Sequence, residues 1–230
     1  MARAHRIFVT GSTGYMGARL ISRLSAEGFE VLALTRAQSQ HKLPQQCTPV
    51  IGDALNGDSY RRFAEGADTL IQLVGVSHPS PSKATQFRHI DLKAGLEAIS
   101  VARQVQVQHF IYVSVAQPAP IMHRYLEVRA ECERAILASG LAATVLRPWY
   151  VLGPGHLWPY CLVPLYKLAE LFPRTREGAL RLGLVTIQQM VCALAHAVEN
   201  PPAGVSILTV PDIRSAAMSQ SEKRTVPALP

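Results

Sequence analysis

The sequence TGSTGYMG at residues 10–17 decides the fold of this chain. It follows the short apolar run RIFV at residues 6–9 and opens a helical pattern over residues 15–26. A glycine-rich turn of this kind joins a buried strand to the N-terminus of a helix. The N–H groups of the first helical turn have no intrahelical partners, and the helix dipole adds partial positive charge there. The junction is therefore suited to binding a phosphate group.

Each of the three glycines has a role in this interpretation. Gly11 permits the tight turn, Gly14 lets the backbone approach a pyrophosphate, and Gly17 lets the helix pack closely against the sheet. The hydroxyl groups of Ser12 and Thr13 can add donors. The strand before the turn and the helix after it supply the context that the motif requires. The alternative is a glycine-rich turn that binds nothing.

The spacing Gly-x-x-Gly-x-x-Gly, preceded by Thr10, resembles the short-chain dehydrogenase/reductase superfamily in its extended and atypical branches. Within these branches the similarity is to NmrA-like proteins and to NAD-dependent epimerase/dehydratase-like proteins. The resemblance extends over about residues 6–213. It implies an α/β, NAD(P)-binding Rossmann fold with a small C-terminal substrate-side subregion.

The order of the apolar segments supports the same fold class. Continuous apolar runs, typical of strands buried on both faces, alternate with amphipathic helical patterns, which predicts a doubly wound parallel sheet with its ligand at the carboxyl ends of the strands. We expect a single domain over residues 1–214, substrate-side elements mainly in residues 153–185, and a disordered tail over residues 215–230. The expected strands are residues 6–9, 31–36, 49–51, 69–76, 109–114, 143–148 and 205–210, and the longer expected helices cover residues 15–26, 84–104 and 187–198, with a further helix through residues 125–133.

The end of the second expected strand bears on the choice of cofactor. It finishes with Thr35 and Arg36 and carries no acidic residue. Proteins selective for NAD place an Asp or Glu here for the ribose 2′-hydroxyl, and such a carboxylate would repel the extra phosphate of NADP. Arg36 can form charge-assisted hydrogen bonds to a 2′-phosphate and stack on adenine, so the sequence favours NADP (NADPH) over NAD. The alternative is a solvated surface arginine.

Further cofactor contacts are implied by the resemblance. Asp53 corresponds to an aspartate beside the adenine, and it can also serve as a helix N-cap. Gly75 lets the cofactor ribose pass close to the backbone, and His78, in the loop that follows, is either a ligand contact or a solvated histidine. The implied cofactor-binding positions are Gly11, Ser12, Thr13, Gly14, Tyr15, Met16, Gly17, Arg36, Asp53, Ala54, Val74, Gly75, Ser114, Arg129, Pro148, Trp149 and Tyr150.

The catalytic motif of the superfamily, Tyr-x-x-x-Lys, corresponds to Tyr125 and Arg129, and Ser114 corresponds to the serine that donates to a substrate carbonyl. A spacing of four residues puts Tyr125 and Arg129 on one helix face. Free tyrosine ionises near pH 10, so proton transfer near neutrality needs an adjacent cation. Arginine can stabilise a tyrosinate and bridge ribose hydroxyls, but it does not readily release a proton. The alternative is an ordinary amphipathic helix with an exposed charge.

Residues 143–155 (ATVLRPWYVLGPG) resemble the strand and loop Thr-x-Leu-Arg-Pro … Gly-Pro-Gly of the superfamily. The resemblance places Pro148 at the end of the sixth strand, beside the nicotinamide, where Trp149 and Tyr150 either wall the pocket or pack in the core. The apolar residues 158–172 and the basic residues that follow, up to Arg181, have several interpretations. They can form a substrate lid, a dimer face, a peripheral membrane or protein contact, or a helix that completes the core.

The composition excludes several classes of protein. The chain has 230 residues, of which 48% are hydrophobic and 17% charged, which suits one globular domain and argues against global disorder. No apolar stretch reaches the roughly 18 residues of a membrane span, and residues 1–10 lead directly into the first strand, so we expect no signal peptide and a cytoplasmic protein. The four cysteines and eight histidines show no metal-ligand spacing, so we expect free thiols and no metal.

The net charge of +7 comes from scattered basic residues without a Lys/Arg run. We therefore expect attraction of an anionic cofactor rather than binding of nucleic acid.

Three functions agree with the sequence to different degrees. The first is an NADP(H)-dependent oxidoreductase or epimerase-like enzyme, monomeric or homodimeric, that acts on a small carbonyl or hydroxyl substrate. The second is a non-catalytic NADPH-binding redox sensor or assembly factor that acts through a partner surface. The third, a nucleic-acid-binding regulator, depends on the positive charge alone.

Overall fold

The protein, in a computed structural model, is described for residues 5–77, 79–154 and 172–225. Its main sheet has seven parallel strands in the order β3-β2-β1-β4-β5-β6-β9, which confirms the predicted doubly wound Rossmann fold. These strands are β1 Arg6–Thr10, β2 Glu30–Thr35, β3 Thr48–Ile51, β4 Thr69–Gln72, β5 His109–Val113, β6 Ala143–Leu146 and β9 Val205–Leu208. Two further strands, β7 Tyr150–Leu152 and β8 Leu184–Thr186, form a separate parallel pair.

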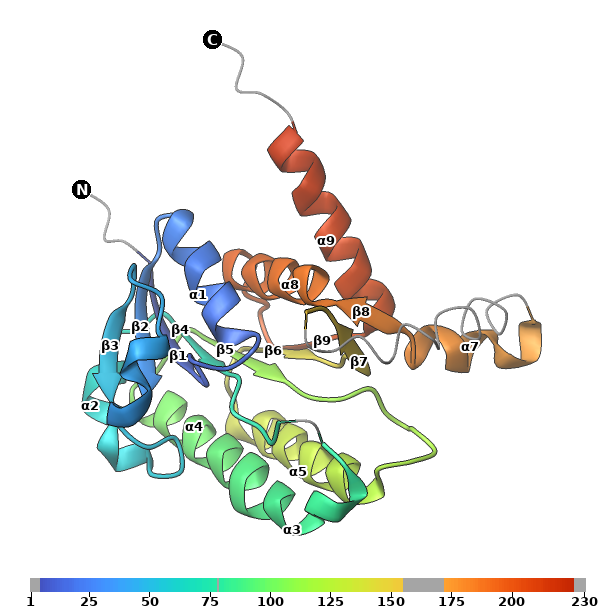
Figure 1. Cartoon of the computed structure of the whole chain (residues 1–230), viewed down its shortest axis with the longest axis horizontal. Coiled ribbons are helices and arrows are strands. Elements are labelled where there is room, and N and C mark those ends of the chain that lie inside the picture. The colour runs from blue at the N-terminus through green and yellow to red at the C-terminus, as the bar shows by residue number, and fades with distance from the viewer. Residues whose placement is uncertain (1–4, 78, 155–171, 226–230) are drawn as a thin grey trace.

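The helices form two layers on either side of the main sheet (Figure 1). On one face lie α1 Gly17–Ala26, α8 Ile187–Glu199 and α9 Val210–Thr225, and on the other lie α4 Lys93–Gln104 and α5 His123–Ser139. The shorter elements are α2 Arg61–Ala64, α3 Ala84–Gln86, α7 Pro173–Arg181, the 3-10 segments η1 Ala37–Lys42, η2 Gly57–Ser59 and η3 Pro81–Lys83, and the π-helical segment η4 Phe87–Leu92.

The alternation of side chains along β1 explains why the sheet is covered on both faces. Ile7 and Val9 point into the core under α1 and α8, while Phe8 points into the core under α4 and α5, and all three are fully buried. The Phe8 ring stacks on Tyr60 with 5.6 Å between ring centroids. A strand that is apolar on both faces has no solvated side, so β1 can only occupy the centre of a sheet of this kind.

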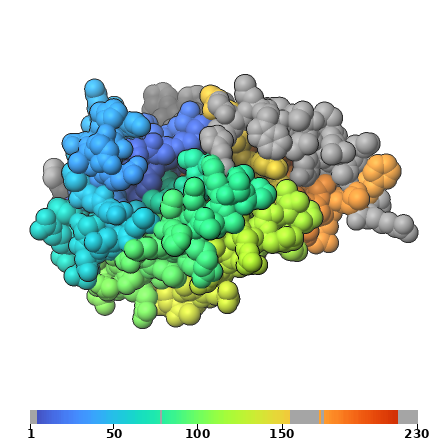
Figure 2. Space-filling model, turned by 60° about the horizontal axis from the view of Figure 1, so that its bottom comes forward, coloured from blue at the N-terminus to red at the C-terminus, as the bar shows by residue number. Residues whose placement is uncertain are grey.

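The topology places the ligand-binding edge of the sheet between β1 and β4. From β1 the chain adds β2 and β3 on one side, then returns to add β4, β5 and β6 on the other. In doubly wound sheets this reversal opens a crevice at the carboxyl ends of the two central strands. Figure 2 shows a hollow in this face, with dark-blue atoms of the N-terminal segment at its floor.

Some elements differ from the sequence prediction in extent. The helix predicted over residues 84–104 is divided into α3, η4 and α4, and the strand predicted over residues 69–76 ends at Gln72. The apolar residues 158–171 lie outside the described residues, so the interpretation of that segment stays a prediction.

The disordered tail predicted from Ser215 is wrong as far as Thr225, because α9 continues to that residue. At its N-terminus the Asp212 carboxylate accepts hydrogen bonds from the N–H and the hydroxyl of Thr209, at 2.8 and 2.5 Å. Arg214 also donates from Nε and Nη2 to the Leu184 carbonyl at 3.1 and 2.7 Å, which fixes the helix to β8. The sequence of this segment lacks amphipathic periodicity, so the helix depends on contacts that its own pattern does not show.

The buried His109, at the start of β5, predicts a pH dependence of stability. Its Nε2 lies 2.9 Å from Thr144 Oγ1, and its Nδ1 is buried without a partner among the described residues. Burial, with a contribution from nearby His5, lowers the pKa of His109 from 6.5 to about 4. The unfolded chain therefore binds a proton on this side chain at a higher pH than the folded chain does. Stability is full above pH 6.5 and falls by about 3 kcal/mol as the pH approaches 4.

We expect His109→Gln to reduce this loss, measured as the free energy of unfolding in urea between pH 7.5 and pH 4.5. The control is His123→Gln, at an exposed histidine, which should keep the wild-type slope. Identical slopes for all three proteins would contradict the assignment to His109.

Candidate functional site

The glycine turn has the close approaches that its sequence predicts. Gly11 adopts a φ of +70°, and a Cβ at this position would lie 2.7 Å from the carbonyl carbon of Leu73. The Gly14 N–H donates to the Gly11 carbonyl at 3.0 Å and closes the turn. A Cβ at Gly17 would overlap that same carbonyl oxygen, so Gly17 is needed for the close contact between the start of α1 and the turn.

The donors of the turn come from its backbone. The Ser12 hydroxyl is buried and donates to the Val9 carbonyl at 2.7 Å, so the predicted role of Ser12 as a hydroxyl donor to a ligand does not agree with the structure. The N–H groups of Thr13 and Met16 have no acceptor among the residues that the structure describes. Gly14 is exposed, and its missing Cβ leaves room for a ligand close to these donors. The turn at the N-terminus of α1 therefore fits a pyrophosphate.

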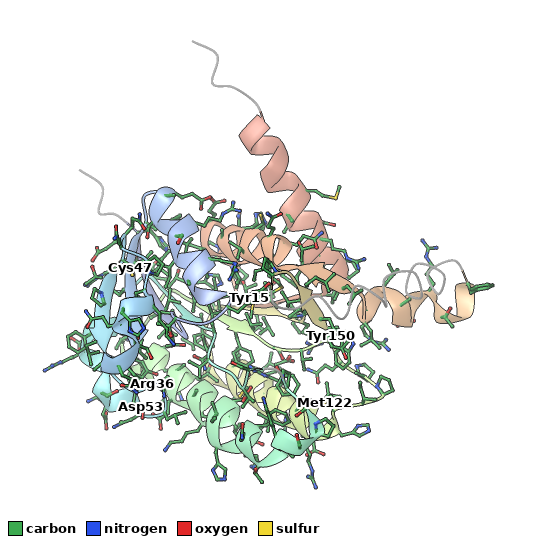
Figure 3. The ribbon with its side chains drawn as sticks, in the orientation of Figure 1. Tyr15, Arg36, Cys47, Asp53, Met122 and Tyr150 are labelled. Carbon is green, nitrogen blue, oxygen red and sulfur yellow. The ribbon has the colours of Figure 1, made fainter. Side chains whose placement is uncertain are left out.

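Tyr15 connects the turn to the far side of the site. The Arg19 guanidinium lies over its ring, 4.4 Å from the ring centroid. Its hydroxyl oxygen lies so close to Gly153 that a Cβ there would overlap it. In Figure 3, Arg36 and Asp53 lie together at one end of the sheet edge, Tyr150 and Met122 lie toward the other end, and Tyr15 lies between them.

Arg36 and Asp53 follow the neighbouring strands β2 and β3, which the Gly52 N–H connects by donating to the Thr35 carbonyl at 3.0 Å. Arg36 is exposed and forms no ion pair with any described residue. One carboxylate oxygen of the exposed Asp53 accepts from the Leu55 N–H at 2.9 Å, which is an Asx-turn contact rather than a helix cap. Ala54, the residue after Asp53, is half-buried. Both charged side chains can thus reach a ligand at the edge of the sheet.

Arg129 does not extend into the site from α5, because its guanidinium is bonded to other parts of the protein. Nη1 donates to the Tyr112 hydroxyl at 3.1 Å and to the Val113 carbonyl at 2.9 Å, and Nη2 forms an ion pair with Asp91 at 2.5 Å. Its Nε is buried without a partner among the described residues. Three of its five N–H groups are thus bonded inside the protein, and a movement of the guanidinium toward ribose hydroxyls would break these bonds.

The loop after β4 lies directly against this ion pair. Val74 is half-buried and Gly75 is exposed, and a Cβ at Gly75 would lie 2.6 Å from Arg129 Nη2 and 3.0 Å from Asp91 Oδ1. The Val76 N–H donates to Asp91 Oδ2 at 3.1 Å. Gly75 is therefore needed for the close contact between the loop and the ion pair, in addition to its predicted role beside the ribose.

Tyr125 is half-buried and packs on Phe87, with 5.0 Å between ring centroids. The Arg129 guanidinium lies 5.0 Å from the centre of its ring. Burial raises the pKa of Tyr125 above its ordinary value of 10.0, and the charge of Arg129 offsets only part of this rise. The tyrosinate near neutral pH that the motif suggests is therefore disfavoured, and the Tyr125 hydroxyl keeps its proton.

Ser114 belongs to a second buried network. Ser114 is 3% exposed, and its hydroxyl donates to Glu133 Oε1, so its proton is already engaged inside the protein. Arg147 binds the same carboxylate with Nε, at 3.1 Å from Oε1, and with Nη2 on Oε2. Ser114 is consequently arranged as part of the connection between β5, α5 and β6, and the predicted donation to a substrate carbonyl does not agree with this geometry.

The segment after β6 lies as predicted at the end of the strand. Pro148 is buried, and its carbonyl accepts from the Ala116 N–H at 2.8 Å. The rings of Trp149 and Tyr150 meet edge to face at 5.4 Å and both are half-buried. Burial raises the pKa of Tyr150. These two rings can form a wall of the site as well as part of its packing.

Sequence reasoning missed four polar residues of the site: Asp91, Tyr112, Glu133 and Arg147. Glu133 follows Arg129 by four residues on the same helix face, so helical spacing could have found it. Asp91 lies 38 residues before Arg129, and no local pattern connects them. Among the described residues no group of His, Cys, Asp and Glu side chains could hold a metal ion. In the same part of the chain, no helix is both long and apolar enough to cross a membrane.

Comparisons with known proteins identify the family and the fold. The family model described as the NAD dependent epimerase/dehydratase family matches residues 7–131, which contain the glycine turn, Arg36, Asp91 and Arg129. A solved structure of the Bordetella bronchiseptica enzyme WbmH in complex with NAD+ superposes with a TM-score of 0.67 over 99% of this chain and 84% of that chain. At 18% sequence identity this likeness shows the fold alone.

Two curated relatives are reductases by name. The ceramide reductase of Caulobacter vibrioides is 22% identical over 210 residues, which cover 90% of this chain and 65% of the relative. The 4-hydroxy-2-methyl-3-oxo-4-farnesyl-3,4-dihydroquinoline-1-oxide ketoreductase of Stigmatella aurantiaca is 25% identical over 170 residues, which cover 64% of this chain and 51% of the relative. The chain thus spans about half to two thirds of the length of these relatives.

Replacing Gly17 by alanine should weaken dinucleotide binding at least tenfold. The new Cβ would overlap the Gly11 carbonyl oxygen and lie 2.9 Å from Ser12 Cα, so the turn has to open. Fluorescence titration with NADPH measures the affinity, and thermal unfolding shows that the variant is folded.

The matched control is Gly178→Ala in α7, where an added Cβ meets nothing within 4 Å. This variant should bind NADPH like the wild type and gain up to about 1 kcal/mol of stability, because alanine is the better helix former. A Gly17→Ala variant that is folded and binds with wild-type affinity would show that the turn does not hold the pyrophosphate.

Proposed function

The chain belongs to the NAD dependent epimerase/dehydratase family, and on this premise we propose that it is an NADP(H)-dependent oxidoreductase that acts on a carbonyl or hydroxyl group of a small molecule. The observation that carries the proposal is the pairing of the glycine turn with an exposed Arg36 at the end of β2. An epimerase-like reaction uses the same site and the same cofactor chemistry.

The preference for NADP is supported by the charges around Arg36. The segment that follows it, η1, contains His41 and Lys42 and no acidic residue. A carboxylate that would repel a 2′-phosphate is therefore missing from the end of β2 and from η1. Arg36 forms no ion pair with a described residue, so its guanidinium is available to bind the 2′-phosphate with two parallel N–H bonds.

The bound cofactor would supply the hydride, and the protein would supply the phosphate cradle and a proton. Tyr125 is the proton donor in this proposal, because its raised pKa keeps the hydroxyl protonated. The Arg129 guanidinium beside it can only donate hydrogen bonds, so it does not take up the tyrosine proton. A protonated donor suits reduction of a carbonyl better than oxidation of an alcohol. The names of the two reductase relatives support the same direction and suggest apolar carbonyl compounds as first substrates to test.

A second candidate function is supported by the buried position of Arg129. Its terminal nitrogens are held by Asp91, Tyr112 and Val113, so the cation that normally assists the tyrosine is not directed at the site. A non-catalytic NADP(H)-binding protein that acts through a partner would keep the phosphate cradle and lose this assistance.

Arg36→Ala should lower the affinity for NADPH by ten- to a hundredfold and change the affinity for NADH less than twofold, because only NADPH carries the 2′-phosphate. The measurement is a titration of each protein with NADPH, NADP+, NADH and NAD+. Arg103→Ala, at an exposed arginine near the end of α4, is the control and should bind all four nucleotides like the wild type. Equal loss for NADPH and NADH would contradict the role of Arg36, and a wild type that binds none of the four would contradict the proposed function.

Turnover separates the two candidate functions. With NADPH and a panel of apolar ketones, we expect oxidation of NADPH that falls at least a hundredfold in Tyr125→Phe. The rate of reduction should stay level up to about pH 9, because Tyr125 loses its proton only above its ordinary value of 10.0. Tight NADPH binding without turnover on the whole panel would favour the non-catalytic function, and full activity in Tyr125→Phe would exclude this tyrosine as the acid.

A further inference from the structure

The buried ion pair of Asp91 and Arg129 joins parts of the protein that are distant in sequence. Asp91 is fully buried on the π-helical segment η4, and the Arg129 side chain on α5 is 7% exposed. Asp91 Oδ1 binds Arg129 Nη2, and its Oδ2 accepts the Val76 N–H from the loop after β4. Arg129 Nη1 binds the end of β5 through the Val113 carbonyl. Four elements therefore meet at one pair of charges.

We propose that Asp91 and Arg129 are a positioning pair that fixes the loop of residues 73–76 for dinucleotide binding, and that Arg129 acts on the cofactor through this loop rather than by contact. The inference rests on the proposed function, since it assigns to Arg129 a task other than the one that the catalytic motif implies. It also assigns a role to Asp91.

The hydrogen bonds of Arg129 support this assignment. Moving the guanidinium toward a ligand at the edge of the sheet would take Nη1 from Tyr112 and Val113, and Nη2 from Asp91. The first change would leave a buried carbonyl without its donor, and the second would leave a buried carboxylate without its countercharge. Such a movement would replace bonds inside the protein by bonds to the cofactor and would leave a buried group unpaired.

The contacts of the loop support the same conclusion. A Cβ at Gly75 would meet both members of the pair, at 2.6 Å from Arg129 Nη2 and 3.0 Å from Asp91 Oδ1. The next residue, Val76, is bonded to Asp91 through its backbone. The loop therefore lies on the ion pair, and its position depends on where the two side chains are held. The neighbouring Leu73 backbone is also the surface against which Gly11 packs, so the position of the loop and that of the glycine turn depend on each other.

Removing one charge and removing both charges should have different effects. Asp91→Asn leaves the Arg129 cation buried without its partner, and Arg129→Met leaves the Asp91 carboxylate in the same situation. In the double variant no charge remains, and the side-chain oxygen of the introduced asparagine can still accept the Val76 N–H. If the two residues are a positioning pair, the second substitution should restore part of the affinity for NADP+ that the first substitution removes.

The experiment is a double-mutant cycle of Asp91→Asn and Arg129→Met, with NADP+ as the probe. We expect each single variant to bind NADP+ at least tenfold more weakly than the wild type, and the double variant to bind within about threefold of the wild type. If Arg129 instead contacted the ribose, the double variant would bind at least as weakly as Arg129→Met, and Asp91→Asn would have the smaller effect. That pattern would overturn the proposal.

A matched control cycle is available on the same two elements. Arg88 on η4 and Glu131 on α5 form an exposed ion pair at 3.4 Å. Arg88→Met, Glu131→Gln and their combination should change the affinity for NADP+ less than twofold, because exposed pairs contribute little. Melting temperatures of all variants show whether a change in affinity reflects a loss of folded protein.

A second measurement does not depend on cofactor binding. Hydrogen exchange of the Val76 amide should accelerate at least tenfold in Asp91→Asn and Arg129→Met relative to the global opening of each variant, and it should return toward the wild-type rate in the double variant. Unchanged exchange at Val76 in the single variants would overturn the proposal even if NADP+ binds. If the wild type bound no dinucleotide while Val76 behaved as expected, the proposed function would fail and the connection between pair and loop would stand.

Discussion

The close approach of Gly11 to the backbone after β4 is the constraint on which the rest of the structure depends. Its φ is positive, and a Cβ added to it would lie 2.7 Å from the Leu73 carbonyl carbon, so the position has room for glycine alone. Because β1 and β4 are neighbours at the point where the strand order reverses, this contact holds the glycine turn and the loop after β4 at the same edge of the sheet. Both parts of the candidate dinucleotide site therefore follow from one backbone contact.

The inward face of α5 determines what the site can do chemically. Arg129 and Glu133 lie one helical turn apart, and each is neutralised by an opposite charge from another element, Asp91 on η4 and Arg147 after β6. Buried charges of this kind are tolerated when an opposite charge and hydrogen bonds compensate them, and the pairing fixes the elements that carry them. The Arg129 charge that the catalytic motif would direct at a substrate therefore connects the walls of the site, and Tyr125 is the residue to which we assign proton transfer in the proposed reaction.

Local patterns predicted most of the fold, and the prediction of the cofactor side of the site also depends on them. The buried strands, the glycine turn and the acid-free end of β2 at Arg36 all depend on residues close together in sequence. The ion-pair partner of Arg129 could not be found this way, because Asp91 lies 38 residues away, on the separate segment η4. The role predicted for Ser114 did not agree with the structure for the same reason, since its acceptor, Glu133, belongs to another element. The helix α9 was missed because tertiary contacts, rather than its own pattern, stabilise it.

The most direct measurement is a crystal structure of the protein with NADP+ bound. We expect the pyrophosphate on the backbone N–H groups of residues 13–16, the 2′-phosphate within hydrogen-bond distance of Arg36, and Arg129 still paired with Asp91 beneath Gly75. A structure in which Arg129 has left Asp91 to bind the ribose, or in which the 2′-phosphate lies away from Arg36, would contradict this assignment of the site.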